Sequence, residues 1–190
     1  MERNYIEDTN FEKVDFAQTP LLVSDYEHCS FMNCNFSNCD LSNINFSECV
    51  FTGCNFSMAK TGKTSLREVQ FKECKLLGIH FSDCDRFLLS FGFDNCLLNL
   101  SSFYSLQLKK TSFKNCSLIE VDFSEADLTE SIFENCDLTN AVFDNSVLEK
   151  ANLRTAYNYS IDPWRNKIRK AKFSLPEVVG LLGGFDIEIS

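Results

Sequence analysis

Phenylalanine or leucine recurs at every fifth residue along most of this 190-residue chain. The series runs from Phe11 to Phe81, slips by two residues, and resumes from Leu88 to Leu153. A period of five matches neither an α-helix, which repeats near 3.6 residues, nor a flat strand, which repeats at 2. The chain must therefore turn a corner every five residues, and a fixed period of this kind predicts a solenoid.

Each five-residue unit combines two inward-facing positions with three outward-facing ones. A small residue stands two positions before the Phe or Leu, so both side chains share one face of an extended segment. Successive coils therefore stack as parallel strands. Every fourth inward position, counted across the slip, is phenylalanine in one file of residues: Phe11, Phe31, Phe51, Phe71, Phe93, Phe113 and Phe133.

All ten cysteines occupy the small position of the unit. Ser, Thr and Ala fill it at ten other units, so the position favours a small side chain, and buried free cysteine behaves as one. In-register neighbours are poorly aimed for disulfide bonds, so we expect reduced thiols. Zinc at His28 and Cys29, or at His80 and Cys84, is disfavoured because zinc needs ligands that converge tetrahedrally.

No catalytic grouping stands out in the sequence. Gly62-Lys63-Thr64 is similar to the end of a phosphate-binding loop, but Ser57 stands where that motif requires a glycine. The two histidines and the mostly outward carboxylates form no credible acid–base pair. We therefore expect a protein that is not an enzyme and that uses no cofactor or metal.

The formal net charge of −9 argues against direct binding of nucleic acid and instead suggests a basic partner. No apolar run is long enough for a transmembrane helix, and the first residues lack the pattern of a secretory signal. We expect a cytoplasmic protein without membrane association.

The segment from Ser117 to Glu149 contains nine carboxylates and no Lys or Arg. Over roughly 8 Å of stacked coils, this charge density is comparable with that of duplex DNA, which carries one charge per about 1.7 Å. The alternative is an ordinary solvated face. The candidate partner-binding residues are Glu120, Asp122, Glu125, Asp127, Glu130, Glu134, Asp137, Asp144 and Glu149.

The two-residue slip lies between Asp83 and Phe91. We expect a bulge at one corner of the coil, formed by Asp85, Arg86 and Phe87. It is either a contact loop, since irregular segments often carry function, or a structural irregularity alone.

The period ends near residue 155, and the tail that follows predicts a helix and a strand. Ser174-Leu175-Pro176-Glu177 is typical of a helix start, and the apolar residues that follow have helical spacing. Alternation from Phe185 onwards predicts a short strand. The expected organisation is an N-terminal cap over residues 1–10, a coil over 11–155 with the slip near 85–89, and a C-terminal cap over 156–190.

Apolar residues in the tail exceed what is needed to cover one end of a coil. This favours a two-fold homodimer over a tail that only caps its own coil. The predicted interface consists of Leu175, Val178, Val179, Leu182, Phe185, Ile187 and Ile189.

The repeat resembles the A(D/N)LxX signature of pentapeptide-repeat proteins over about 145 residues. This resemblance implies an all-β solenoid, a right-handed quadrilateral parallel β-helix with 20 residues and four units per coil, followed by a short helix and strand. The tail is similar to the dimerisation module of the topoisomerase-protecting members, which include Qnr-type, microcin-immunity and albicidin-immunity proteins, and looks closest to the albicidin-immunity type.

The resemblance implies a DNA mimic that protects DNA gyrase or topoisomerase IV from an inhibitor, as antibiotic resistance or as self-immunity. The inhibitor would be a quinolone, albicidin or a microcin, although the chain lacks the long loops of some Qnr members. The alternative is a general protein-interaction scaffold with an unknown partner.

Overall fold

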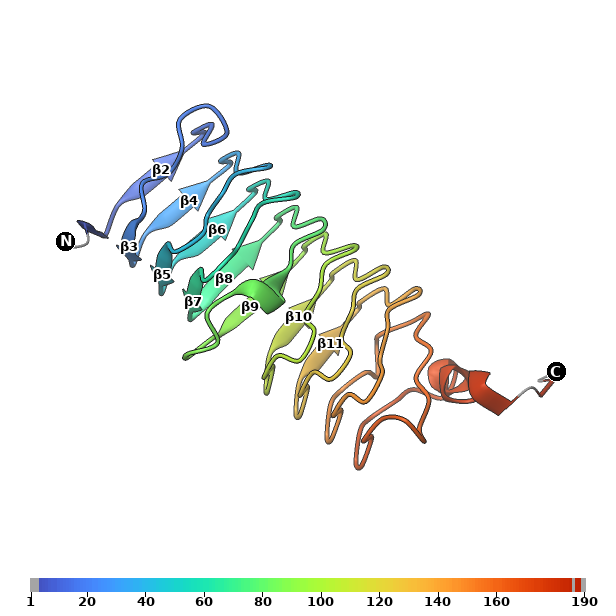
Figure 1. Ribbon diagram of the computed structural model, residues 1–190. Coiled ribbons are helices and arrows are strands. Elements are labelled where there is room, and N and C mark those ends of the chain that lie inside the picture. The colour runs from blue at the N-terminus through green and yellow to red at the C-terminus, as the bar shows by residue number, and fades with distance from the viewer. Residues whose placement is uncertain (1–3, 186, 189–190) are drawn as a thin grey trace.

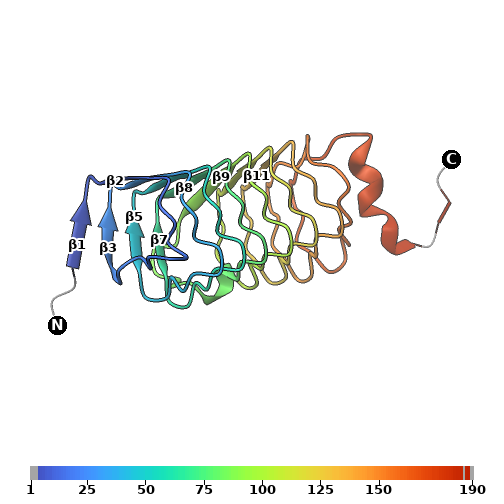
Figure 2. The same ribbon diagram turned by 90° about the horizontal axis from the view of Figure 1, so that it is seen from above.

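The computed structural model describes residues 4–185 and 187–188, and it forms a rod with the two chain ends at opposite ends (Figures 1 and 2). All strand pairing in the described residues is parallel, so the chain is a β-solenoid. The elements are β1 (Asn4–Glu7), β2 (Asn10–Glu12), β3 (Ser24–Glu27), β4 (Ser30–Met32), β5 (Asn45–Ser47), β6 (Val50–Thr52), β7 (Ser65–Arg67), β8 (Val69–Lys72), η1 (Phe81–Asp83), β9 (Phe91–Asp94), β10 (Ser112–Lys114), β11 (Ile132–Glu134), η2 (Glu177–Leu181) and η3 (Gly183–Phe185).

Four ladders run along the rod and define four faces. Face I is the seven-stranded sheet β2-β4-β6-β8-β9-β10-β11, and face IV begins as the sheet β1-β3-β5-β7. Faces II and III, which follow face I along the chain, consist of single bridges. The bridges of face II run from Asp15 to Tyr157, those of face III pair Asp40 with Lys60 and then run from His80 to Val142, and those that continue face IV run from Gln107 to Lys167. The solenoid is therefore four-sided, as predicted.

The predicted file of phenylalanines is confirmed. Rings from Phe11 to Phe133 stack at centroid distances of 4.6 to 5.3 Å. A second file from Phe81 to Phe143 stacks at 4.7 to 5.2 Å. The two files meet edge to face, as at Phe113 and Phe123, which is a favoured geometry for aromatic pairs. The apolar interior is thus a continuous column of rings.

The small position carries a hydrogen bond that size alone does not predict. The Cys136 thiol donates to the carbonyl of Phe113, 23 residues earlier, over 3.4 Å, and the Ser131 hydroxyl does the same to Leu108 over 2.8 Å. All ten cysteines are free, and all except the half-buried Cys39 are buried. Where Cys, Ser or Thr occupies the position, its side chain can therefore tie one coil to the one before it.

The slip changes the ladder spacing from 20 to 22 residues. Phe51 pairs with Phe71, whereas Phe71 pairs with Phe93. The sequence frame places Leu88 inside, but Leu88 is 64% exposed and Phe91 is buried in its place. Phe91 occupies the small position before Phe93, and its large ring fills the space that Leu88 would need.

The tail differs from the predicted helix and strand. The expected helix is a short 3-10 helix, η2, and Phe185 belongs to the 3-10 helix η3, where a strand was expected to begin. The Gly180 carbonyl accepts a hydrogen bond from the Ile161 amide over 2.9 Å. This contact fixes η2 against the last coil and leaves little length for regular helix. Ile187 is described without secondary structure, and Ile189 lies outside the described residues.

The ladder also extends beyond the expected limits of the coil. At the N-terminus, β1 already pairs with β3, and at the other end Asn152 bridges to Lys172. Backbone pairing does not need the Phe or Leu signature, so it continues where the sequence period has faded. No helix in the described part of the chain has both the length and the apolar character to cross a membrane.

Candidate functional site

The nine candidate carboxylates do not gather on one side of the rod. Because each coil turns through all four faces, a window of 33 residues winds around the whole solenoid. Glu134 lies on face I, Asp137 on face II, Asp122 and Asp144 on face III, Asp127 and Glu149 on face IV, and Glu120, Glu125 and Glu130 at the turns between faces.

Four of the nine carboxylates form ion pairs within the chain. The hydrogen bond from Lys150 holds the pKa of Glu130 below its usual value. Such exposed pairs contribute little stability, but they reduce the charge available to a partner. The pairs are Lys109–Asp127 (3.2 Å), Lys150–Glu130 (2.8 Å), Lys114–Glu134 (3.8 Å) and Arg165–Asp144 (2.8 Å).

Two further carboxylates accept hydrogen bonds that shape the backbone. The Ser124 amide donates to Asp122 Oδ1 over 2.9 Å, and the Thr139 amide donates to Asp137 Oδ1 over 3.1 Å. These are Asx turns, which stabilise the corner that follows. This local role explains why Asp or Asn recurs before the inward Phe or Leu.

Glu120, Asp122 and Glu125 remain together on face III and at its two edges, and we call them the face III cluster. None of the three forms an ion pair in the described residues. A hydrogen bond to Glu125 raises the pKa of the neighbouring Tyr104. This part of the predicted acidic surface is the one where carboxylates are adjacent and not neutralised.

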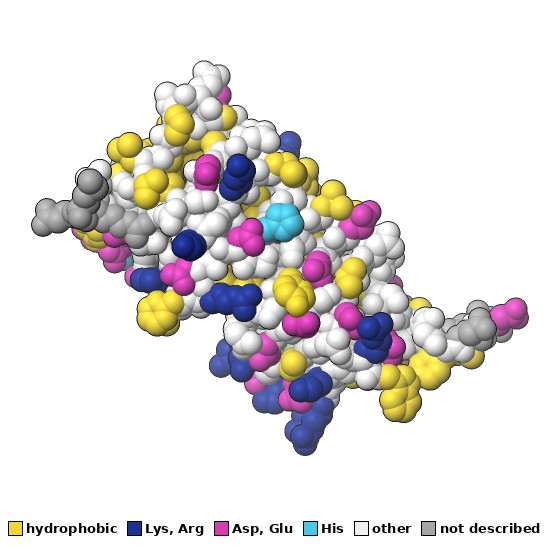
Figure 3. All heavy atoms as spheres, viewed as in Figure 1, with side chains coloured by type: hydrophobic (Ala, Val, Ile, Leu, Met, Phe, Trp, Pro, Cys, Tyr) yellow, Lys and Arg dark blue, Asp and Glu magenta, His cyan; other side chains and the backbone are white. Residues whose placement is uncertain are grey.

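A basic region that the sequence analysis did not predict follows the acidic window directly in the sequence. Residues 150–172 contain seven of the chain's 18 Lys and Arg residues and a single carboxylate, Asp162. Figure 3 shows Lys and Arg side chains gathered at the lower edge of the C-terminal half of the rod. A count of charged residues by segment would have revealed this basic region, because it begins at Lys150, directly after the acidic window ends at Glu149.

The insertion lies on face IV, where Asp85 and Ser90 donate backbone hydrogen bonds to Thr64 and Leu66 of the preceding coil. The Arg67 guanidinium stands over the Phe87 ring at 5.4 Å, and Arg86 Nη1 donates to the Ser105 carbonyl over 3.2 Å. Phe87 and Leu88 remain about two-thirds exposed. Two surface hollows flank the loop, one beside Ser105 and Gln107 and the other beside Ser47 and Arg67. The two arginines hold the loop in place and leave its apolar tip outside.

The predicted dimer residues are partly exposed at the C-terminal end. Leu175 is 90% exposed, and Val179, Phe185 and Ile187 are also exposed. Val178 and Leu182 are half-buried. In Figures 1 and 2 the backbone of the tail lies beyond the last coil, at the C-terminal end of the rod.

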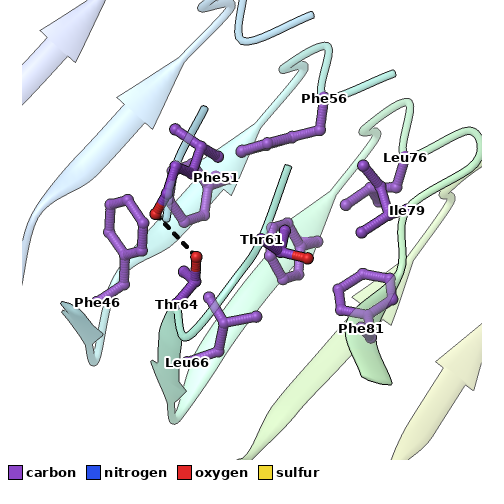
Figure 4. A pocket seen from close by; sticks show the side chains of 11 residues that line it. Phe46, Phe51, Phe56, Thr61, Thr64, Leu66, Leu76, Ile79 and Phe81 are labelled. Atoms are coloured by element: carbon purple, nitrogen blue, oxygen red, sulfur yellow. Dashed lines mark hydrogen bonds between the residues drawn. The ribbon is translucent and has the colours of Figure 1, made fainter. Parts of the chain in front are cut away.

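A cavity of about 20 Å³ lies inside the rod, enclosed by rings and aliphatic side chains (Figure 4). It forms where Thr61 replaces the usual Phe or Leu, and the Thr61 hydroxyl donates to the His80 carbonyl over 2.7 Å. A space of this size holds about one water molecule. It cannot admit a substrate.

Among the described residues, one group of three possible metal ligands comes together, and it involves no cysteine. His28 lies 3.9 Å from Glu27, which is half-buried, and 3.6 Å from Glu48, which is exposed like His28 itself. The cysteines beside the two histidines are buried in the coil. This group of possible ligands contains neither Cys29 nor Cys84.

Comparison with known proteins identifies the repeat. A family model described as "Pentapeptide repeat region" matches residues 24–91 and 88–157. Comparison with curated proteins gives no match.

Two solved structures share the fold. A trypsin-treated variant of QnrB1, described as a plasmid-mediated fluoroquinolone resistance protein, is 16% identical, with a TM-score of 0.63 over 99% of this chain and 98% of that chain. HetL, described as a pentapeptide repeat protein involved in heterocyst differentiation regulation from the cyanobacterium Nostoc sp. strain PCC 7120, is 16% identical, with a TM-score of 0.58 over 91% of this chain and 87% of that chain.

The family model covers most of the chain, and the residues it matches lie within the four parallel ladders. This protein belongs to the pentapeptide-repeat family.

Proposed function

We propose that this protein is a non-enzymatic, cytoplasmic binding protein that protects a type II topoisomerase, chiefly DNA gyrase, from an inhibitor. It does so by presenting carboxylates to the basic surface that otherwise binds DNA. The observation that carries the proposal is the face III cluster, whose three carboxylates are adjacent and form no ion pair in the described residues. Family membership and the filled interior, which offers no cleft for catalysis, support it.

The acidic surface in this proposal is smaller than nine residues. Asp127, Glu130, Glu134 and Asp144 face cations of their own chain. Among the described residues, Glu120, Asp122 and Glu125 form no ion pair, so they can meet a basic partner without first giving up a cation of their own chain, which lowers the cost of binding.

The tail supplies the second part of the proposal, a homodimer. Leu175, Val179, Phe185 and Ile187 expose apolar surface at one end of the rod. A two-fold contact between two tails would bury it and double the length of the rod. Each protomer would then carry its face III cluster on one side of the joint.

The test is a gyrase supercoiling assay with a quinolone, albicidin or a microcin, with and without this protein. We expect supercoiling to resume with at least one of the three inhibitor classes. A variant with Glu120, Asp122 and Glu125 changed to Lys should lose rescue. A matched variant with Glu73, Glu134 and Glu149 changed to Lys carries the same charge on other faces and should retain it.

Rescue with none of the inhibitors, together with no binding to gyrase, would refute the proposal.

A general interaction scaffold is the second candidate function. HetL, whose description concerns heterocyst differentiation regulation, has the same fold at the same identity as QnrB1. The fold alone therefore does not choose between partners, and affinity capture of a partner other than a topoisomerase would favour the scaffold.

A further inference from the structure

Face IV is polarised along the rod. Its first four stacked segments, at residues 4–8, 24–28, 44–48 and 64–68, carry six carboxylates and one arginine. Its last four, at residues 107–110, 127–130, 147–150 and 167–170, carry six Lys or Arg residues and three carboxylates. The acidic residues are Glu7, Asp8, Asp25, Glu27, Glu48 and Glu68, and the basic residues are Lys109, Lys110, Lys150, Lys167, Arg169 and Lys170.

The insertion occupies the middle of this face. Four segments precede it and four follow it, because the ladder of face IV breaks after β7 and resumes at Gln107. The exposed Phe87 and Leu88 stand at this central break, and a surface hollow lies on each side of them. The face thus has an apolar centre between ends of opposite charge.

We propose that face IV binds face IV of a second copy of this chain, with the two rods side by side and antiparallel. A two-fold axis through the insertion places each acidic end opposite the partner's basic end. It also brings the two apolar loop tips together at the axis, each beside the hollows of the other copy. An interface that matches itself in this way closes as a symmetric dimer.

The match is strongest at the ends of the rod. Segment 4–8, with Glu7 and Asp8, faces segment 167–170, which contains three cations and no carboxylate. Next to the axis, segment 64–68 carries both Arg67 and Glu68 and faces Lys109 and Lys110, so it adds little net attraction. Between them, Asp127 and Glu130 face the acidic Glu48, but they are already paired with Lys109 and Lys150 of their own chain.

The dimension of the face predicts a weak and salt-sensitive contact. Face IV consists of nine stacked segments, counting the insertion, which lie about 4.8 Å apart along the rod. With a width of one five-residue unit, the face offers an area on the order of 600 Å² to each partner, below the roughly 800 Å² of a standard interface. Charges at the rim are screened by salt, whereas an apolar contact is not. This contact is separate from the tail and does not depend on the proposed function.

The test is sedimentation velocity of the full chain at low and high ionic strength. We expect an association step at about 20 mM salt that is lost at about 500 mM, where the Debye length is only a few ångströms. A tail dimer is held by apolar contact and would persist at both. One variant changes Glu7 and Asp8 to Lys, and a second changes Lys167 and Lys170 to Glu.

Each charge variant alone should associate at least about tenfold more weakly, because both ends then carry like charges. An equimolar mixture of the two variants should restore the step, since every end again meets its opposite. Changing Lys60 and Lys75 to Glu alters net charge as much as the second variant does but on other faces, and should have no effect. Phe87→Ser should weaken the step and leave its salt dependence intact.

The inference would be overturned if the mixture of the two variants failed to associate. It would also be overturned if each charge variant alone associated as strongly as the unchanged protein. An association that responds to the Lys60 and Lys75 control would overturn it as well, because it would reflect net charge. Since gyrase is absent from the measurement, neither result bears on topoisomerase protection.

Discussion

At the residue scale, the corner of most five-residue units requires a backbone conformation that few residue types favour. The residue two positions after the inward Phe or Leu has a positive φ along nearly the whole rod, including Asn95 at 54° and Leu100 at 63°. Asn tolerates this left-handed region, whereas a branched apolar side chain is disfavoured there. Asn is frequent at these corners, but Glu, Lys, Leu and Met also occur, so the backbone ladder imposes the conformation even on unsuited residues.

Leu100→Asn should therefore stabilise the protein. Leu100 is 61% exposed, so the change loses little apolar burial and relieves part of a conformational cost of about 1–2 kcal/mol. We expect the free energy of unfolding to rise by roughly 0.5–1 kcal/mol in urea denaturation. Leu98→Asn, two residues away in the buried interior, is the matched control and should be strongly destabilising.

The buried thiols predict an alkaline limit to stability. Burial raises the pKa of Cys49 to about 12 from 9.0 for an exposed thiol, so the native state keeps a proton that the unfolded chain releases. The contribution is complete below pH 9.0 and is lost as the pH rises towards about 12. Denaturation midpoints should fall across this range, and Cys49→Ser should reduce the fall.

At the element scale, stability comes from stacked neighbours. Phe113 is fully buried between Phe93 and Phe133, at centroid distances of 5.3 and 5.0 Å. Each strand of face I has only three or four residues, too few to be stable alone. The rings and the parallel ladder must form together, coil upon coil.

Phe113→Ala should cost about 3–5 kcal/mol, because it removes one ring from a closed file and leaves a cavity. Phe113→Leu keeps most of the volume and should cost less. Phe87→Ala removes a ring of the same size from the exposed loop and should change stability by less than about 0.5 kcal/mol. Equal losses for Phe113→Ala and Phe87→Ala in thermal or urea unfolding would contradict the stacked-file account.

At the scale of the whole molecule, the two ends of the solenoid differ. The C-terminal end is covered by η2, where Glu177 accepts a hydrogen bond from the Asn158 amide over 3.2 Å and Gly180 accepts one from Ile161. A coil edge without such cover exposes unpaired backbone groups. The tail therefore caps its own rod whatever else it binds.

Truncation after Phe173 should loosen the last coil and leave the first coils unchanged. Removal of η2 leaves the Ile161 amide without its partner, and in a solenoid each coil is coupled mainly to its neighbours. Hydrogen exchange should accelerate in residues 156–172 and remain slow in β2 through β8. Uniform acceleration along the rod would mean that the solenoid unfolds as a single unit.

Much of the fold could be predicted because the five-residue period acts locally. The inward files, the cysteine positions and the two-residue slip all follow from residues within one unit or one coil. The tail could not be predicted in the same way. Whether Ser174 to Leu182 becomes a regular helix depends on how Gly180 meets Ile161, a contact that no local pattern encodes.

The sequence by itself determined the solenoid, since a period of five with Phe or Leu inside requires a backbone that turns a corner every five residues, and the resemblance to pentapeptide-repeat proteins supplied the expectation of four sides. Only the tertiary structure decided how charge is arranged. Coiling places residues 20 apart side by side and residues five apart on different faces, so a window that is acidic in sequence is divided around the rod and partly paired with cations. The same coiling gathers Glu7 to Glu68 at one end of face IV and Lys109 to Lys170 at the other, because charge is summed over neighbours in space and not along the chain.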